Sequence, residues 1–135
     1  MRPTTMPSWT MTTKNNYRYY NRRPDGDERE DCVCRAISAA TGLKYDAVEN
    51  LLTLTAQECE CDKLNIHCYH NLIDGTLCYK RYNANGATVG ELSELHKDKR
   101  LIIRINGHLT CSLYGTVVDI WDCTEKRADV YWIIE

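Results

Sequence analysis

Three residue types that together perform thiol chemistry occur in the order Cys, His, Asp along this chain. Cys32 begins a stretch with helical spacing, His108 follows an Asn-Gly turn, and Asp119 lies in the next strand-like stretch. A cysteine in the first turn of a helix is close to unpaired backbone N–H groups and to the positive end of the helix dipole, which favour the thiolate. The three residues therefore predict a nucleophile, a general base and an acid that orients the base.

Strand register decides which acid faces His108. If residues 114 and 115 form the loop of a two-residue hairpin, His108 and Asp119 share one face of the sheet, because side chains alternate along each strand. Asp122 then falls on the opposite face. We therefore expect Asp119 to orient the imidazole. Asp122 remains the alternative, because a one-residue change of register would exchange the two faces.

Other residues near these three have more ordinary explanations. Cys34 lies two residues after Cys32, about 200° around the helix axis, so it cannot face the same cleft and is interpreted as a packing residue. Arg35 stands among small apolar residues and is expected to form a structural ion pair rather than bind substrate. By strand parity Cys111 falls on the face opposite His108, which predicts a position in the core.

A second concentration of cysteine and histidine lies in the weakly patterned segment 58–82. Its members have enough soft ligands for a zinc site, but their spacing matches no common structural zinc pattern. We expect free thiols and surface histidines in this segment and predict no metal or cofactor. The residues concerned are Cys59, Cys61, His67, Cys68, His70 and Cys78.

Length and composition limit the classes of function. A chain of 135 residues fits one domain. Lys plus Arg number 17 and Asp plus Glu 19, a formal net charge of -2, which disfavours nonspecific nucleic-acid binding. The longest aliphatic stretch, residues 101–103, is far shorter than the roughly 20 residues that span a bilayer. The polar N-terminus lacks the apolar region of a secretory signal, so we expect a cytoplasmic protein with reduced cysteines and no membrane partner.

The elements that must position the three residues follow from periodicity and capping signals. A basic arm, residues 1–16, is expected to be disordered, and residues 17–135 to form the domain. The predicted helices are 32–41 with Asp31 as N-cap, 45–57, and one that a Thr88–Glu91 capping box opens and that runs to about His96. The predicted strands are 101–105, 108–114, 116–122 and 130–134, after a first extended segment near residues 17–20. This order predicts an α+β fold with an antiparallel sheet.

Several short motifs carry a resemblance to a known family. They are the D-C-x-x-R-A block at residues 31–36, Gly107-His108, and the D-x-W block at residues 119–121. Over about residues 19–134 the chain resembles small papain-like cysteine peptidase domains found in bacteriophage genomes. The resemblance implies a papain-like fold, with the nucleophile at a helix start packed on the sheet. It maps the nucleophile onto Cys32, the histidine onto His108 and the acid onto Asp119.

The chemistry implied is cleavage of a peptide or isopeptide bond through a thioester acyl-enzyme. The oxyanion needs hydrogen-bond donors, of which the backbone N–H of Cys32 is one. By similarity with an asparagine that precedes a proline turn in the related domains, Asn21 is the candidate for a second donor, and Asn106 is its rival.

Two alternatives remain open from the sequence. One is a noncatalytic protein-interaction module, zinc-stabilised through the segment 58–82. The other keeps the Cys-His-Asp chemistry but acts as an acyltransferase or deamidase, because the outcome depends on which nucleophile the cleft admits. For the peptidase we expect a monomer that acts on a protein or peptide, in the host cytoplasm if the source is viral.

Overall fold

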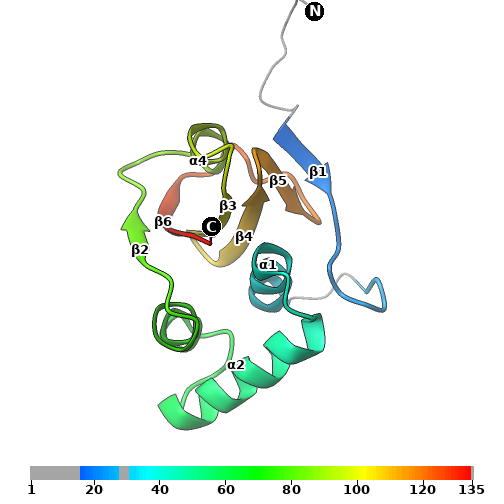
Figure 1. Ribbon diagram of the computed structural model, residues 1–135, viewed down its shortest axis with the longest axis vertical. Coiled ribbons are helices and arrows are strands. Elements are labelled where there is room, and N and C mark those ends of the chain that lie inside the picture. Colours follow the sequence, from blue (N-terminus) through cyan, green and yellow to red (C-terminus); the bar gives the residue numbers. More distant parts are fainter. Residues whose placement is uncertain (1–15, 28–30, 135) are drawn as a thin grey trace, which may run out of the picture.

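The computed structural model describes residues 16–27 and 31–134, which fold into four α-helices and one six-stranded sheet (Figure 1). The chain is therefore α+β. Its helices are α1 (Cys32–Thr41), α2 (Tyr45–Cys59), α3 (Ile66–His70), which continues into a π-helical turn η2 (Asn71–Thr76), and α4 (Val89–Leu95). Its strands are β1 (Tyr17–Tyr19), β2 (Arg81–Asn83), β3 (Arg100–Ile105), β4 (His108–Leu113), β5 (Thr116–Asp119) and β6 (Ala128–Ile133).

The sheet is mixed, whereas the sequence predicted an antiparallel one. Its strand order is β1-β5-β4-β3-β6-β2, and β1 runs parallel to β5 while the other neighbours are antiparallel. A tight hairpin forces neighbouring strands to run antiparallel. No hairpin joins β1 to β5, because the helices and three strands lie between them in the chain, so β1 is free to pair in the parallel direction.

Helices cover both faces of the sheet. Ile37 of α1 packs with Ile102 of β3 and Trp132 of β6 in one apolar cluster. Leu92 of α4 packs with Ile103 of β3 in a second cluster. Because successive side chains of a strand point to opposite faces, Ile102 and Ile103 place the two clusters on opposite sides of the sheet. Burial on both faces of the sheet accounts for the apolar run at residues 101–103 of β3.

The predicted helix boundaries are largely confirmed. Helix α1 spans the predicted residues and ends at Gly42, whose φ of 82° is the left-handed conformation that glycine tolerates. Helix α2 begins at the predicted residue and runs two residues further than expected. Helix α4 has the predicted capping box, in which the side chains of Thr88 and Glu91 bond reciprocally to backbone N–H groups.

The structure differs from the prediction in two segments. Residues 58–82 contain α3, η2 and the short strand β2, none of which has a periodic signal in the sequence. Strand β5 ends at Asp119 instead of Asp122. The chain turns there because the Asp119 carboxylate accepts a bond from the N–H of Ile120, and the Asp122 carboxylate accepts bonds from Thr124. The arm lies almost wholly outside the described residues.

Within the part of the chain that the structure describes, no helix combines the length and the apolar character that crossing a bilayer requires.

Candidate active site

Three element ends meet at the site that the sequence predicted. Cys32 is the first residue of α1, His108 the first of β4, and Asp119 the last of β5. Helix α1 packs directly against β4, and β4 is hydrogen-bonded to β5. Residues at element ends have side chains near the rim of the layers, so packing the body of each element brings the three side chains together without burying them completely.

The structure brings His108 and Asp119 into direct contact. Nε2 of His108 lies 2.6 Å from Oδ2 of Asp119. The hairpin has the predicted loop, since Leu113 pairs with Thr116 across it. The Asp122 carboxylate instead accepts hydrogen bonds from the backbone N–H and the hydroxyl of its neighbour Thr124. The pairing predicted from strand parity is therefore the one observed, and Asp122 is occupied elsewhere.

The Cys32 thiol is partly buried and has a lowered pKa. Burial alone would raise that pKa, but hydrogen bonds from the His108 side chain and the Leu109 backbone, together with the charges of His108 and Arg35, outweigh it. Because Asp119 occupies Nε2 of His108, the nitrogen left for Cys32 is Nδ1. Each ring nitrogen thus serves one partner.

The pKa shifts of His108 and Asp119 both favour the charged form of the group. Burial lowers the pKa of His108, but hydrogen bonds to Asp119, Cys123 and Cys32 raise it to about 11. Burial raises the pKa of Asp119, but the hydrogen bond and the positive charge of His108 bring it below its ordinary value. The charged forms of all three groups therefore favour one another. The lowered pKa of Cys32 and the raised pKa of His108 favour a thiolate beside an imidazolium, with the Asp119 carboxylate on the other ring nitrogen.

A buried acid fixes the start of α1. Asp31 takes the N-cap position, but its carboxylate does not cap the helix as expected. Instead it accepts hydrogen bonds from the guanidinium of Arg35, the hydroxyl of Tyr45 and, at 3.2 Å, the guanidinium of Arg23. Arg35 therefore has the structural ion-pair role expected of it, and it also lies 3.8 Å from Asp119. The first N–H groups of α1 keep no intrahelical partner, as at every helix start.

Asn21 is not brought to the site. Its Nδ2 donates to the backbone carbonyls of Gly26 and Asp27, both at 3.1 Å, and its Oδ1 accepts from the N–H of Arg23. Both amide hydrogens of Asn21 are thus used within its own loop. Neither is free to stabilise an oxyanion, the role predicted for Asn21 from the sequence. The rival Asn106 lies in the wall of the pocket that contains Cys32 and His108.

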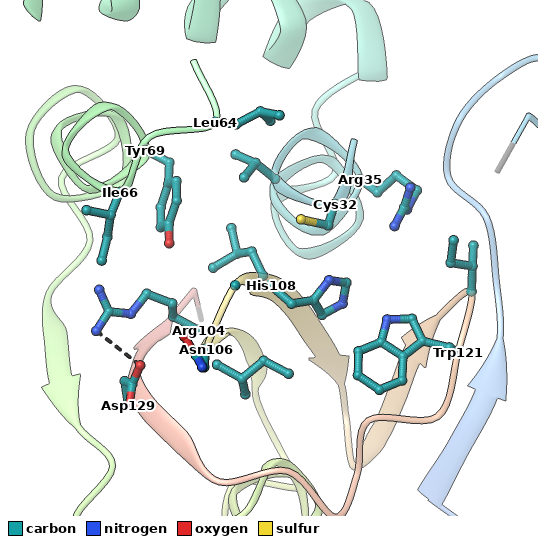
Figure 2. A pocket seen from close by; sticks show the side chains of 15 residues that line it. Cys32, Arg35, Leu64, Ile66, Tyr69, Arg104, Asn106, His108, Trp121 and Asp129 are labelled. Carbon is teal, nitrogen blue, oxygen red and sulfur yellow. Dashed lines mark hydrogen bonds and ion pairs between the residues drawn. The ribbon is translucent and has the colours of Figure 1, made fainter. Parts of the chain in front are cut away.

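That pocket has a volume of about 680 Å³ and is open to solvent (Figure 2). Cys32 and His108 lie on one side of it, and Trp121 packs against His108 with ring centroids 5.1 Å apart. Most of its wall is apolar, and large exposed side chains stand at its mouth. The apolar lining residues are Val33, Leu64, Ile66, Ile105, Leu109, Ile120 and Trp121, of which Leu64, Ile66 and Trp121 are among the exposed ones.

Two polar lining residues were not identified from the sequence. Tyr69, on α3, points its hydroxyl into the pocket, and Arg104, on β3, lies across the pocket from Cys32 (Figure 2). Tyr69 belongs to the segment without a periodic signal. The sequence of β3 could have marked Arg104, because it is a charge directly after the apolar run of residues 101–103.

Three of the other cysteines do not resemble nucleophiles. All eight are free thiols. Burial raises the pKa of Cys34 to about 12, that of Cys68 to about 11, and that of Cys111 further still. These three are core residues, as predicted for Cys34 and Cys111.

Among the described residues, one group offers three donors of the kinds that hold metal ions. It consists of His108, Asp119 and the buried Cys123, whose ligand atoms lie within 4.8 Å of one another. A metal ion there would compete with the hydrogen bond between His108 and Asp119. The segment 58–82 does not gather its ligands in this way: His70, for instance, packs against Trp132 and contacts the Arg81 guanidinium.

Comparison with known proteins adds no family to this geometry. No protein-family model matches the chain, and no curated protein or solved structure matches it either.

Proposed function

We propose that this domain is a thiol hydrolase of the papain-like type, a cysteine peptidase that cleaves peptide or isopeptide bonds. The observation that carries the proposal is the contact chain from Cys32 through His108 to Asp119, which lowers the pKa of the thiol at the edge of an open pocket. The resemblance of the D-C-x-x-R-A and D-x-W blocks to small peptidase domains of bacteriophage genomes agrees with it, as does the helix start on which Cys32 lies.

The first half of the reaction uses the thiolate and the imidazolium. The Sγ of Cys32 attacks the substrate carbonyl carbon, forming a C–S bond and moving the π electrons to the oxygen. The C–N bond then breaks as His108 donates the Nδ1 proton to the leaving amine, which leaves a thioester on Cys32. Asp119 keeps Nε2 protonated throughout, so that the same nitrogen of His108 always faces the substrate.

The second half regenerates the enzyme. Neutral His108 removes a proton from water, the hydroxide oxygen attacks the thioester carbonyl, and the C–S bond breaks. The products are a carboxylic acid and the Cys32 thiolate beside a protonated His108. In both halves we assign the backbone N–H of Cys32 as one oxyanion donor, and the side-chain amide of Asn106, in the pocket wall, is the better supported second donor.

The shape of the pocket supports a peptide as substrate. Leu64, Ile66 and Trp121 are 46%, 36% and 38% exposed around an open mouth. Exposed apolar side chains around a cleft are typical of surfaces that bind another chain. A polypeptide segment that crosses this rim would place one carbonyl at Cys32.

Selective alkylation tests the proposed pair. We expect iodoacetamide to label Cys32 of the native protein faster than any other cysteine at pH 6, where an ordinary thiol with a pKa of about 8.5 is almost fully protonated. Peptide mapping by mass spectrometry identifies the labelled residue. His108→Ala should remove the preference for Cys32. His96→Ala is the matched control, since His96 contacts Tyr131 away from the pocket.

The exposed Cys78 provides an internal reference in every sample. If Cys32 reacts no faster than Cys78 at pH 6 in the wild type, the thiol is not activated and the proposal is wrong. The same holds if His108→Ala and His96→Ala behave alike.

A further inference from the structure

The side of the pocket across from Cys32 contains hydrogen-bond donors that the peptidase reaction does not use. Arg104 and Tyr69 both line it, from β3 and α3 respectively (Figure 2). The catalytic steps need only the thiol, the imidazole, the carboxylate and the oxyanion donors. Donors beyond these determine what part of the substrate fits beside the scissile bond.

The guanidinium of Arg104 is only partly satisfied. Its side chain is 17% exposed, and in the described part of the chain its one ion pair is a 3.3 Å contact from Nη2 to Asp129, a carboxylate that is itself 50% exposed. Its buried Nε has no hydrogen-bond partner among the described residues. A guanidinium has five N–H donors, and it binds carboxylates best when two of them act together. Arg104 therefore keeps donors for a further anion.

Tyr69 adds a second donor beside it. The ring is buried, with 7% of the residue exposed, while the hydroxyl points into the pocket. Within the described part of the chain this hydroxyl makes no hydrogen bond. Burial raises the pKa of Tyr69, and the charge of Arg104 is near enough to oppose that shift. The phenol is therefore protonated at neutral pH and can donate.

The lining of the pocket favours an anionic ligand group over a cationic one. Asp129 is the only acidic residue among the lining residues, and Asn106 lies beside Arg104 in the same wall. A ligand group at this place meets the donors of Arg104 and Tyr69 and a mostly apolar wall. Negative charge with a flat pair of acceptor oxygens satisfies both donors at once.

We propose that Arg104 and Tyr69 form a carboxylate subsite, so that the pocket selects a substrate with a carboxylate a few bonds from the carbonyl that Cys32 attacks. The carboxylate belongs either to an acidic side chain or to the end of a peptide chain. This inference rests on the proposed function, since it uses Cys32 as the reacting group, and it specifies the class of substrate that the same site takes.

Three chloroacetyl compounds of nearly equal size distinguish the sources. They are N-chloroacetyl-glutamate α-amide, with a side-chain carboxylate, N-chloroacetyl-glutamine, with a terminal carboxylate, and the neutral N-chloroacetyl-glutamine amide. In each, the Cys32 thiolate displaces chloride, forming a C–S bond as the C–Cl bond breaks. The rate of labelling at Cys32 is followed by mass spectrometry, with chloroacetamide as the probe that has no tail.

We expect one of the two anionic probes to label Cys32 about tenfold faster than the neutral one, the factor that one charge-assisted hydrogen bond supplies. The faster anion identifies the source of the carboxylate. Arg104→Gln should remove the advantage, and Tyr69→Phe, which keeps the buried ring, should reduce it. Asp129→Asn should increase it, because a competing anion is lost. Lys97→Gln is the charge-matched control, since this lysine is 71% exposed and does not line the pocket.

The rate with chloroacetamide shows whether the proposed function fails or only the carboxylate subsite. If chloroacetamide does not prefer Cys32 over the other cysteines, the proposed function is wrong. If it does, and all three tailed probes react equally in the wild type, the carboxylate subsite is wrong while the thiol hydrolase stands. An advantage that Arg104→Gln and Lys97→Gln reduce equally would also overturn the subsite, because it would reflect overall charge. Circular dichroism verifies that each variant is folded, and the rate of each tailed probe is divided by the chloroacetamide rate of the same variant.

Discussion

The carboxylate of Asp119 accepts bonds from His108 Nε2 at 2.6 Å and from the backbone N–H of Ile120 at 2.7 Å. It is also 95% buried, with 5% of the residue exposed. A buried negative charge has a large effect on a neighbouring cation because little water screens it. The raised pKa of His108 therefore depends on Asp119, and through His108 so does the lowered pKa of Cys32.

Asp119→Asn tests this dependence. The amide oxygen can still accept from Nε2, but the charge is gone, so the pKa of His108 falls and the thiolate loses its cationic partner. We expect iodoacetamide labelling of Cys32 at pH 6 to slow by at least about tenfold, the effect of one pKa unit, and the midpoint of its pH profile to move upward. Asp122→Asn is the matched control because Asp122 serves Thr124. Equal slowing in both variants would contradict the assignment of Asp119.

At the scale of the elements, the Asp31 network, which is Asp31 with its donors Arg35, Tyr45 and Arg23, joins α1 to α2 and to the segment before α1. Asp31 and Arg35 are 7% and 6% exposed, and Tyr45 brings in the start of α2. Removing one partner of a buried ion pair is costly since it leaves the other charge without compensation. The orientation of the helix that carries Cys32 therefore depends on a residue with no part in the reaction.

We expect Asp31→Ala to lower the free energy of unfolding by about 3–5 kcal/mol, because Arg35 would remain buried without its main partner. Urea unfolding, followed by circular dichroism, measures it. Asp46→Ala changes an exposed acid in the first turn of α2 and should stay within about 0.5 kcal/mol of the wild type. Similar midpoints for the two variants would mean that the network does not support α1.

Local signals explain which elements the sequence predicts well. Helix α1 has a regular apolar stripe and a glycine stop, and the hairpin loop at residues 114 and 115 determines that Asp119 faces His108. Asn21 could not be placed from the sequence, because its amide is captured by carbonyls of its own loop. Tyr69 could not be found either, since α3 is only five residues long and passes into a π-helical turn that obscures the helical period.

At the scale of the whole molecule, Cys32 and His108 contribute to the way stability varies with pH. His108 has its pKa raised from 6.5 to about 11, and Cys32 has its pKa lowered from 9.0. Between pH 6.5 and 9.0 the folded His108 keeps a proton that it loses in the unfolded state, whereas the lowered pKa of Cys32 favours loss of a proton that the unfolded state keeps. These two differences have opposite signs, so they oppose each other in the dependence of stability on pH within that window.

Outside the range from pH 6.5 to 9.0, only one of the two residues changes the stability. Above pH 9.0 the unfolded pair loses its last proton while the folded pair keeps one, so stability falls as the pH rises towards about 11. Below pH 6.5 His108 is protonated in both states and adds no slope, while the lowered pKa of Cys32 makes stability fall with the pH until the folded thiol is protonated. In Cys32→Ala the unfolded state loses the His108 proton near pH 6.5, and the decline should begin there. Urea unfolding of both proteins from pH 5 to pH 10 compares them, and parallel curves would contradict the ion pair.

The parallel strand at the edge of the sheet has a practical consequence for anyone who shortens this protein. The N–H of Tyr20 donates to the backbone carbonyl of Asp119 at 2.9 Å, and the hydroxyl of Tyr17 donates to the same carbonyl at 3.1 Å. Tyr17 and Tyr20 thus hold the backbone of Asp119, the residue that raises the pKa of His108. A deletion that ends before Tyr17 leaves both hydrogen bonds intact. One that extends to Tyr20 would remove both hydrogen bonds to the backbone of Asp119, although the side chains of Cys32, His108 and Asp119 would all still be present.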